Sequence, residues 1–144
     1  MTQIITMDNI VLNIPREPHE DAIRRCGEML VNSGYVLPRY TEGMLARDRG
    51  FTTAIGNCIA IPHGEKDYKR DILHTGIVVL TYPDPIDWEG QPVHLVIGIA
   101  ARGEEHLDIL GNIVDQLESR EDVLTLVNGG DKNAIYAMLT GDSV

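Results

Sequence analysis

An almost wholly apolar stretch in the second half of the chain reads Val93-His94-Leu95-Val96-Ile97-Gly98-Ile99-Ala100-Ala101. Its continuous apolar character and its β-branched residues are typical of a strand that is buried on both faces. Two earlier runs, Thr75 to Tyr82 and Cys58 to Ile61, have the same character, and a shorter strand is expected at residues 10–12. Strands of this kind need helices above and below the sheet to cover them.

Four segments outside these strands predict helices. Apolar residues recur at helical spacing in residues 22–30 and again in residues 107–117. A further helix is expected at about residues 38–47, and a terminal one at residues 131–139. Neither repeats nor linkers interrupt the sequence, so residues 1–144 are expected to form one domain. The predicted fold class is α/β, with a mixed β-sheet flanked by helices on both faces in an α/β/α arrangement.

The composition excludes several classes of partner. With 12 Lys and Arg against 22 Asp and Glu, the formal net charge is −10, which repels nucleic acid and anionic membranes and suits a basic protein partner. The apolar runs are shorter than the ~20 residues that cross a bilayer, and residues 1–8 lack the basic start of a secretory signal. We therefore expect a cytoplasmic protein without membrane insertion, whose cysteines Cys26 and Cys58 are buried and not paired.

One histidine stands at the end of a predicted strand. In Ile59-Ala60-Ile61-Pro62-His63-Gly64, Pro62 cannot extend a ladder of hydrogen bonds, so His63 is presented at the carboxyl end of the strand. Ligand crevices of open α/β sheets lie at that edge, and Gly64 leaves room for a partner or a phosphate. A neutral imidazole is a nucleophile and can form a covalent intermediate. Taken alone, a histidine that follows a proline in a loop is more often structural or merely exposed.

Further motifs surround this segment. They are, in order, Met44-Leu45-Ala46-Arg47-Asp48, residues 59–64, the charged residues 67–70, Thr75-Gly76-Ile77-Val78-Val79, Leu95-Val96-Ile97-Gly98-Ile99-Ala100-Ala101-Arg102 and Glu105-His106. Together they resemble the mannitol/fructose-type enzyme IIA (EIIA) family of the phosphoenolpyruvate-dependent sugar phosphotransferase system, and most closely its mannitol-specific members. The resemblance covers nearly the whole chain. Residues 50–55 depart from the family's pattern near the site, which leaves the sugar open.

The resemblance implies a phosphoryl relay that needs neither a cofactor nor a metal. The histidine phosphocarrier protein (HPr) would pass a phosphoryl group to His63. His63 would then pass it to a IIB domain of a mannitol- or fructose-type permease, for uptake of a sugar or hexitol. His106 and Arg47 match the other active-site positions of the family. These roles are chemically coherent, because phosphoryl transfer relies on positioning and on stabilising the charge of the equatorial oxygens.

The other polar candidates have simpler interpretations. His106 is expected in the first turn of the helix that follows the third strand, with that helix start facing the phosphorylated histidine. Without the resemblance, His106 would be taken as an exposed residue and Arg47 as a solvated charge. His94 is expected to be a packed or edge-strand residue, and both His74 and His19 are expected to be solvated.

Three other functions fit parts of the sequence. A regulatory, nitrogen-type EIIA paralogue would share the fold and would act through phosphorylation-dependent protein binding. A metal-dependent hydrolase would need the histidines at positions 63, 74, 94 and 106 as ligands, but none of them forms the closely spaced pairs typical of metal sites. A plain ligand-binding α/β module would need no covalent chemistry.

Overall fold

The described part of the chain in this computed structural model comprises residues 4–64, 66–101 and 105–140. These residues form a mixed, five-stranded sheet in the order β1-β4-β5-β3-β2. The strands are β1 (Ile10–Val11), β2 (Ala54–Gly56), β3 (Ile59–Ala60), β4 (Gly76–Trp88) and β5 (Gln91–Ala100). The outer strands are short, so the sheet is built on its two long central strands.

The two long strands form an antiparallel hairpin. Their pairing runs from Gly76 opposite Ala100 to Trp88 opposite Gln91, with an irregular register between Thr81 and Ile86. The turn residues Glu89 and Gly90 have φ angles of 53° and 92°. Tight two-residue hairpin turns require this backbone conformation, with positive φ at both residues. Strand β1 joins β4 in parallel, β3 joins β5 in parallel, and β2 is antiparallel to β3.

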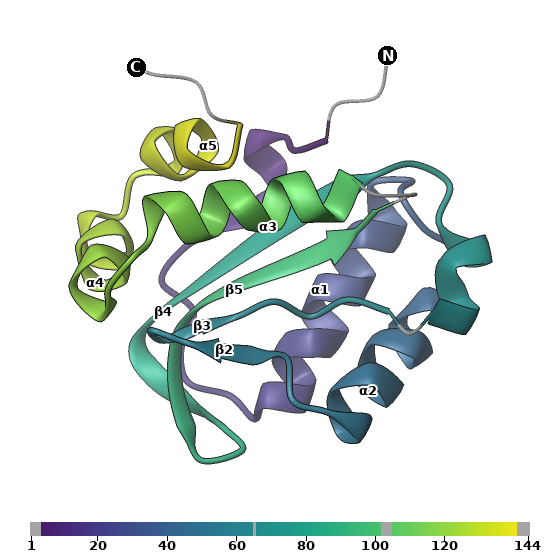
Figure 1. Ribbon diagram of the computed structural model, residues 1–144, viewed down its shortest axis with the longest axis horizontal. Coiled ribbons are helices and arrows are strands. Elements are labelled where there is room, and N and C mark those ends of the chain that lie inside the picture. The colour runs from purple at the N-terminus through teal and green to yellow at the C-terminus, as the bar shows by residue number, and fades with distance from the viewer. Residues whose placement is uncertain (1–3, 65, 102–104, 141–144) are drawn as a thin grey trace.

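Helices cover both faces of the sheet, as Figure 1 shows. One face is covered by α1 (His19–Asn32) and α2 (Tyr40–Gly50), and the other by α3 (Glu105–Gln116), α4 (Arg120–Gly129) and α5 (Lys132–Thr140). Short 3-10 helices occupy Met7–Asn9 (η1) and Lys66–Asp71 (η2). Alternate residues of β4 enter the two cores: Val78 and Leu80 pack with α1, whereas Ile77 and Val79 pack under α3 to α5.

The predicted fold class is confirmed, and most predicted elements are present with shifted ends. Besides the two 3-10 helices, β2, which has only three residues, and α4 were not predicted. The predicted end of the strand that begins near Thr75 was wrong, because β4 continues through the prolines at 83 and 85 as far as Trp88. Cys26 and Cys58 are both buried and unpaired, and they lie in the cores on opposite faces of the sheet.

A close approach at Gly98 sets the distance between α1 and the sheet. An ideal Cβ at this position would stand 2.8 Å from the Cβ of Cys26 on α1 and 2.9 Å from a methyl group of Val78 on β4. Both neighbours belong to the packed core, so they have little freedom to move aside. The absence of a side chain at position 98 therefore lets the helix rest on the strand backbone.

We predict that Gly98→Ala destabilises the protein by about 1–3 kcal/mol through overpacking. Gly111→Ala is the matched control, because Gly111 lies in α3 and an ideal Cβ there would have nothing within 4 Å of it. Alanine at position 111 should raise stability by up to about 1 kcal/mol. Urea unfolding of the two variants beside wild type measures the difference. Equal stability of Gly98→Ala and wild type would contradict the close approach.

Candidate active site

His63 is held by backbone hydrogen bonds on two sides. The Ile61 N–H donates to Thr53 O over 2.9 Å, and the Ile99 N–H donates to Pro62 O over 2.9 Å. His63 itself pairs with Ile99 as an isolated parallel bridge beyond the end of β3. Because β3 and β5 are parallel, their carboxyl ends meet here, and His63 stands at the edge where α/β sheets form their ligand crevices. The predicted position of His63 at this edge is therefore confirmed.

The imidazole of His63 has a defined tautomer. Its Nδ1 lies 2.9 Å from the carbonyl oxygen of Ile61. A carbonyl oxygen only accepts hydrogen bonds, so Nδ1 carries the proton in this contact. In the neutral ring the lone pair is then on Nε2, which is the nitrogen that can act as a nucleophile. The ring is half-buried.

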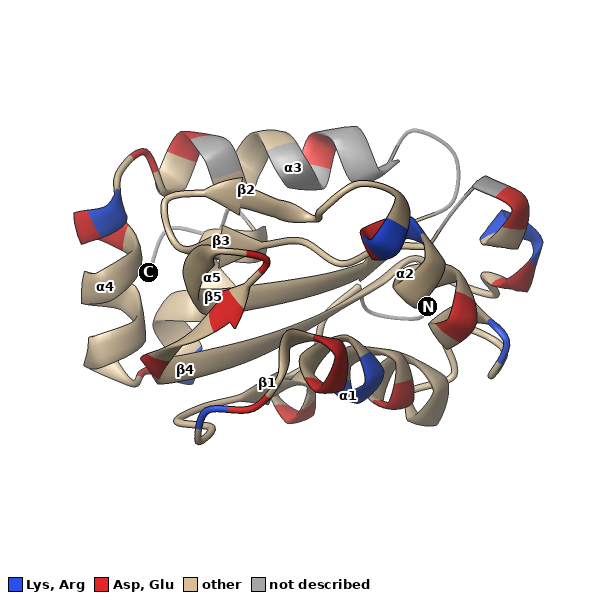
Figure 2. Cartoon of the chain, turned by 90° about the horizontal axis from the view of Figure 1, so that it is seen from below, with Lys and Arg blue, Asp and Glu red and all other residues tan. Residues whose placement is uncertain are grey.

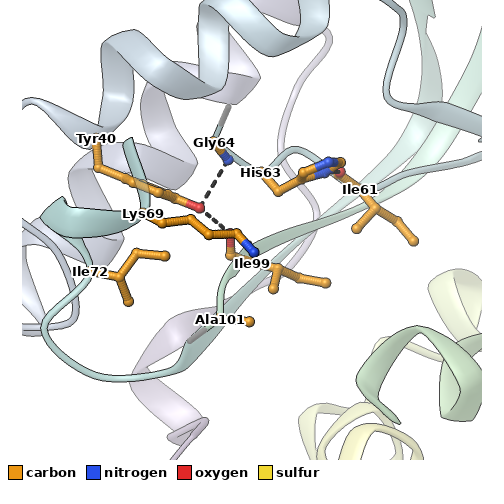
Figure 3. Close-up of a pocket in the computed structure, with 8 residues that line it drawn as sticks. All are labelled: Tyr40, Ile61, His63, Gly64, Lys69, Ile72, Ile99 and Ala101. Atoms are coloured by element: carbon orange, nitrogen blue, oxygen red, sulfur yellow. Dashed lines mark hydrogen bonds between the residues drawn. The ribbon is translucent and has the colours of Figure 1, made fainter. Parts of the chain in front are cut away.

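Tyr40, the first residue of α2, joins the histidine loop to β5. Its hydroxyl donates to Ile99 O and accepts from the Gly64 N–H, each over 2.9 Å (Figure 3). Burial raises the pKa of this hydroxyl to about 12, so it remains a donor. A Cβ at Gly64 would stand 2.5 Å from the Tyr40 ring. Gly64 therefore makes room for Tyr40, in addition to any room for a partner that the sequence suggested.

A small pocket opens beside these groups. Figure 3 shows the residues that line it: Tyr40, Ile61, His63, Gly64, Lys69, Ile72, Ile99 and Ala101. Lys69, from η2, brings a positive charge into a lining that is otherwise largely apolar. Sequence reasoning singled out neither Tyr40 nor Lys69. A tyrosine at a helix start gives no functional signal, whereas Lys69 lay within a charged stretch that already belonged to the resemblance.

The other two predicted site residues are placed less completely. Arg47 is on α2, two turns beyond Tyr40 and on the same helix face. Its guanidinium donates to Phe51 O over 2.6 Å and lies 5.8 Å from the Phe51 ring centre, and it is not among the described residues that line the pocket. The backbone of His106 is in the first turn of α3, as predicted. The side chain of His106 lies outside the described part of the structure.

Similarity to known proteins agrees with this geometry. The model of the family described as "Phosphoenolpyruvate-dependent sugar phosphotransferase system, EIIA 2" matches residues 3–141. The chain belongs to this EIIA family. It is thus an EIIA component, a phosphotransferase that passes a phosphoryl group on by way of a histidine.

Individual relatives cover nearly the whole EIIA chain. The "Mannitol-specific phosphotransferase enzyme IIA component" of Halalkalibacterium halodurans is 39% identical over 136 residues, which is 94% of each chain. The crystal structure of IIA mannitol from Escherichia coli has a TM-score of 0.84 and 34% identity, covering 93% of this chain and 97% of that one. The Escherichia coli complex of enzyme IIAMTL with phosphorylated enzyme IIBMTL has a TM-score of 0.84 and 33% identity, covering 93% of this chain and 95% of that one.

The other histidines whose side chains are described, His19, His74 and His94, do not line the pocket. His74 is exposed, as predicted, and His94 is buried with its Nδ1 2.8 Å from Tyr82 O, which confirms a packed residue. The prediction of a solvated His19 was wrong, because its ring packs on Trp88 and its Nε2 lies 3.2 Å from Asp48 Oδ2. Within the described part of the chain, every helix is too short or too polar to pass through a bilayer.

Asp48, next to Arg47, anchors the segment that leads to β3. Its Oδ1 accepts from the backbone N–H and hydroxyl of Thr53 and from the Trp88 indole. Burial alone would raise the pKa of this carboxyl, but the hydrogen bonds from Thr53 and Trp88, with a contribution from His19, bring it below its ordinary value. Since Thr53 O accepts from Ile61, this carboxylate supports the backbone two residues before His63.

We predict that Tyr40→Phe lowers the stability of EIIA by about 1–3 kcal/mol, because the Gly64 N–H and Ile99 O lose a buried partner. Tyr68→Phe is the control, since the Tyr68 ring packs on Gly43 and under Arg39 and its hydroxyl makes no hydrogen bond to a side chain or backbone group of the described residues. Thermal unfolding measures both. A loss in Tyr68→Phe as large as in Tyr40→Phe would remove the special role of the Tyr40 hydroxyl.

We predict that Asp48→Asn destabilises EIIA at neutral pH by about 1–3 kcal/mol, because its hydrogen bonds lose their charge. The lowered folded pKa makes this stabilisation complete above the unfolded value of about 3.9, and it is lost as the pH falls through the lower folded pKa. Urea unfolding at pH 7 and at a series of acidic pH values should therefore show the free energies of unfolding of wild type and Asp48→Asn converging as the pH falls. A difference that stays constant down to the most acidic pH would contradict the charged role.

Proposed function

We propose that His63 of this EIIA accepts a phosphoryl group from the histidine phosphocarrier protein and passes it to the IIB domain of a mannitol-type permease. We also infer that it works in the cytoplasm, whose reducing conditions suit two buried, unpaired cysteines. The observation that carries the proposal is the hydrogen bond between His63 Nδ1 and Ile61 O, because it directs the ring's lone pair to one nitrogen.

The proposed chemical step is the transfer of one phosphoryl group from one histidine to another. The Nε2 lone pair of His63 attacks the phosphorus atom of the donor's phosphohistidine. A new nitrogen–phosphorus bond forms as the bond to the donor nitrogen breaks, and that nitrogen leaves with its electron pair. Transfer to the acceptor side chain of IIB repeats the step in the other direction. The hydrogen bond at Nδ1 stabilises the positive charge that the ring acquires when Nε2 is phosphorylated.

The surroundings of His63 supply groups suited to the moving phosphoryl group. Lys69 lines the pocket, and a cation there attracts the equatorial oxygens. We assign Arg47 and His106 the same kind of role. The planar guanidinium of Arg47 can donate two parallel hydrogen bonds to phosphate oxygens. His106 is also in the first turn of α3, where backbone N–H groups favour an anion. The present contact of Arg47 with Phe51 O would be exchanged for one with phosphate.

The names of relatives support the choice of partner and sugar. Relatives 39% identical, from Halalkalibacterium halodurans and from Geobacillus stearothermophilus, are described as mannitol-specific EIIA components. A solved relative at 33% identity is a complex with phosphorylated IIBMTL. The nitrogen regulatory protein IIA-Ntr of Neisseria meningitidis is 19% identical with a TM-score of 0.75, which is a likeness of fold. These levels of sequence identity favour the transport role over the regulatory one.

The test is a stepwise phosphorylation followed by intact-mass measurement. The purified chain is incubated with phosphoenolpyruvate, enzyme I and HPr, and a mannitol-type IIB domain is then added. One acid-labile phosphoryl group should appear on the chain and should move to IIB. His63→Ala should accept none, whereas His74→Ala, which removes an exposed histidine, should behave as wild type. Acceptance by His63→Ala, or none by wild type, would overturn the proposal.

The same assay separates the helper residues. Arg47→Gln should slow transfer roughly a hundredfold, the usual effect of losing one charge-stabilising donor. Arg49→Gln is the matched control, because Arg49 is exposed and contacts Glu20 instead. Equal rates for the two variants would remove Arg47 from the site. A chain that is phosphorylated by HPr but passes nothing to a mannitol-type IIB would instead support the regulatory role.

A further inference from the structure

Three side chains that sequence analysis left without a role meet where α1 begins, α2 ends and the β4–β5 hairpin turns. His19 begins α1, Asp48 lies near the end of α2, and Glu89 is in the turn between β4 and β5. His19 Nε2 lies 3.2 Å from Asp48 Oδ2 and 3.7 Å from Glu89 Oε1. One ligand atom from each residue falls within 4.8 Å of the other two. The cluster therefore gathers one imidazole nitrogen and two carboxylate oxygens.

Asp48 is fixed in the orientation that a ligand needs. Its side chain is 2% exposed, and its Oδ1 is occupied by the Thr53 N–H, the Thr53 hydroxyl and the Trp88 indole N–H. The other oxygen, Oδ2, is thereby turned toward His19. Hydrogen bonds of this kind, made to the part of a ligand that does not touch the ion, are what orient the ligands of metal sites.

His19 and Glu89 complete the cluster from its open side. The His19 ring packs on Trp88, with 5.2 Å between ring centres, so its Nε2 is held toward the two carboxylates. The side chains of His19 and Glu89 are 21% and 43% exposed, which leaves a path from solvent. Figure 2 shows acidic residues on α1, on α2 and on the β4–β5 hairpin. Two of the three cluster side chains are carboxylates, and these attract a cation.

We propose that His19, Asp48 and Glu89 bind a divalent transition-metal ion such as Zn²⁺. Zinc takes nitrogen and oxygen ligands at about 2.0–2.2 Å in a tetrahedron, so neighbouring ligand atoms stand roughly 3.4 Å apart. The separations of 3.2 and 3.7 Å bracket that value. A small rotation of the exposed Glu89 side chain would bring its oxygen to a similar distance from the Asp48 oxygen. Water fills the fourth position. The imidazole ligand favours zinc over magnesium, which prefers an all-oxygen shell.

The proposed ion has a structural role, because it joins three elements and none of its three ligands lines the His63 pocket. Glu89 is at the turn that begins β5, whereas Ile99, beside His63, is at its other end, roughly 30 Å away along an extended strand. Binding joins the start of α1, the end of α2 and the hairpin, which are otherwise held here by side-chain contacts. The inference stands independently of the proposed role of His63.

Isothermal titration of the untagged chain with Zn²⁺ alone tests the site. One ion per chain should bind, and the thermal midpoint should rise with zinc. His19→Gln and Glu89→Gln should each weaken binding at least about tenfold and abolish the rise in midpoint. Glu20→Gln is the matched control, because Glu20 neighbours His19 but contacts Arg24 and Arg49, and it should bind zinc as wild type does.

Three results would overturn the proposal. They are no zinc binding by wild type, unchanged binding in His19→Gln, and tighter binding of Mg²⁺ than of Zn²⁺. His63→Gln separates this cluster from the pocket: it should retain the zinc-dependent rise, and loss of that rise would assign the ion to the His63 region instead. Both cluster variants alter partly exposed side chains, and circular dichroism without metal shows that they fold before binding is compared.

Discussion

The antiparallel pairing of β4 with β5 is the constraint on which the other elements depend. These are the long strands, and helices bury them on both faces. Each therefore sends alternate side chains into two separate cores, and β1 and β3 add to them in parallel on either side. Once this pair is in register, the outer strands have only one edge each to join, and the helices have only two faces to cover.

The geometry of the candidate site follows from that pairing. Because β3 runs parallel to β5, its last residues arrive at the edge where β5 ends, and Pro62 stops the strand one residue before His63. Tyr40 then holds both backbones from α2 through a single hydroxyl. His63 thus owes its place to hydrogen bonds between main-chain groups and one side chain. The Nδ1 atom of the imidazole faces the carbonyl oxygen of Ile61, two residues earlier in its own loop.

Local patterns in the sequence predicted what local physics determines. The buried strands, the amphipathic helices and the position of His63 after Pro62 were all readable from runs, periodicity and the properties of proline. Strand β2 was not, because three residues carry too short a pattern. Helix α4 had a readable signal in Ser119 and Asp122, which form a capping box. The contacts of Tyr40 with Gly64 and of His19 with Asp48 join residues 24 or more positions apart, which no local pattern records.

The contact between Tyr40 and Gly64 has a consequence for protein engineering. The ring occupies the space where a side chain at position 64 would lie, and its hydroxyl satisfies the N–H of that same residue. The two positions therefore depend on each other both sterically and through a hydrogen bond, although one begins a helix and the other lies in the loop after β3. A designer who transplants the histidine loop onto another scaffold must carry over the first turn of α2 with it.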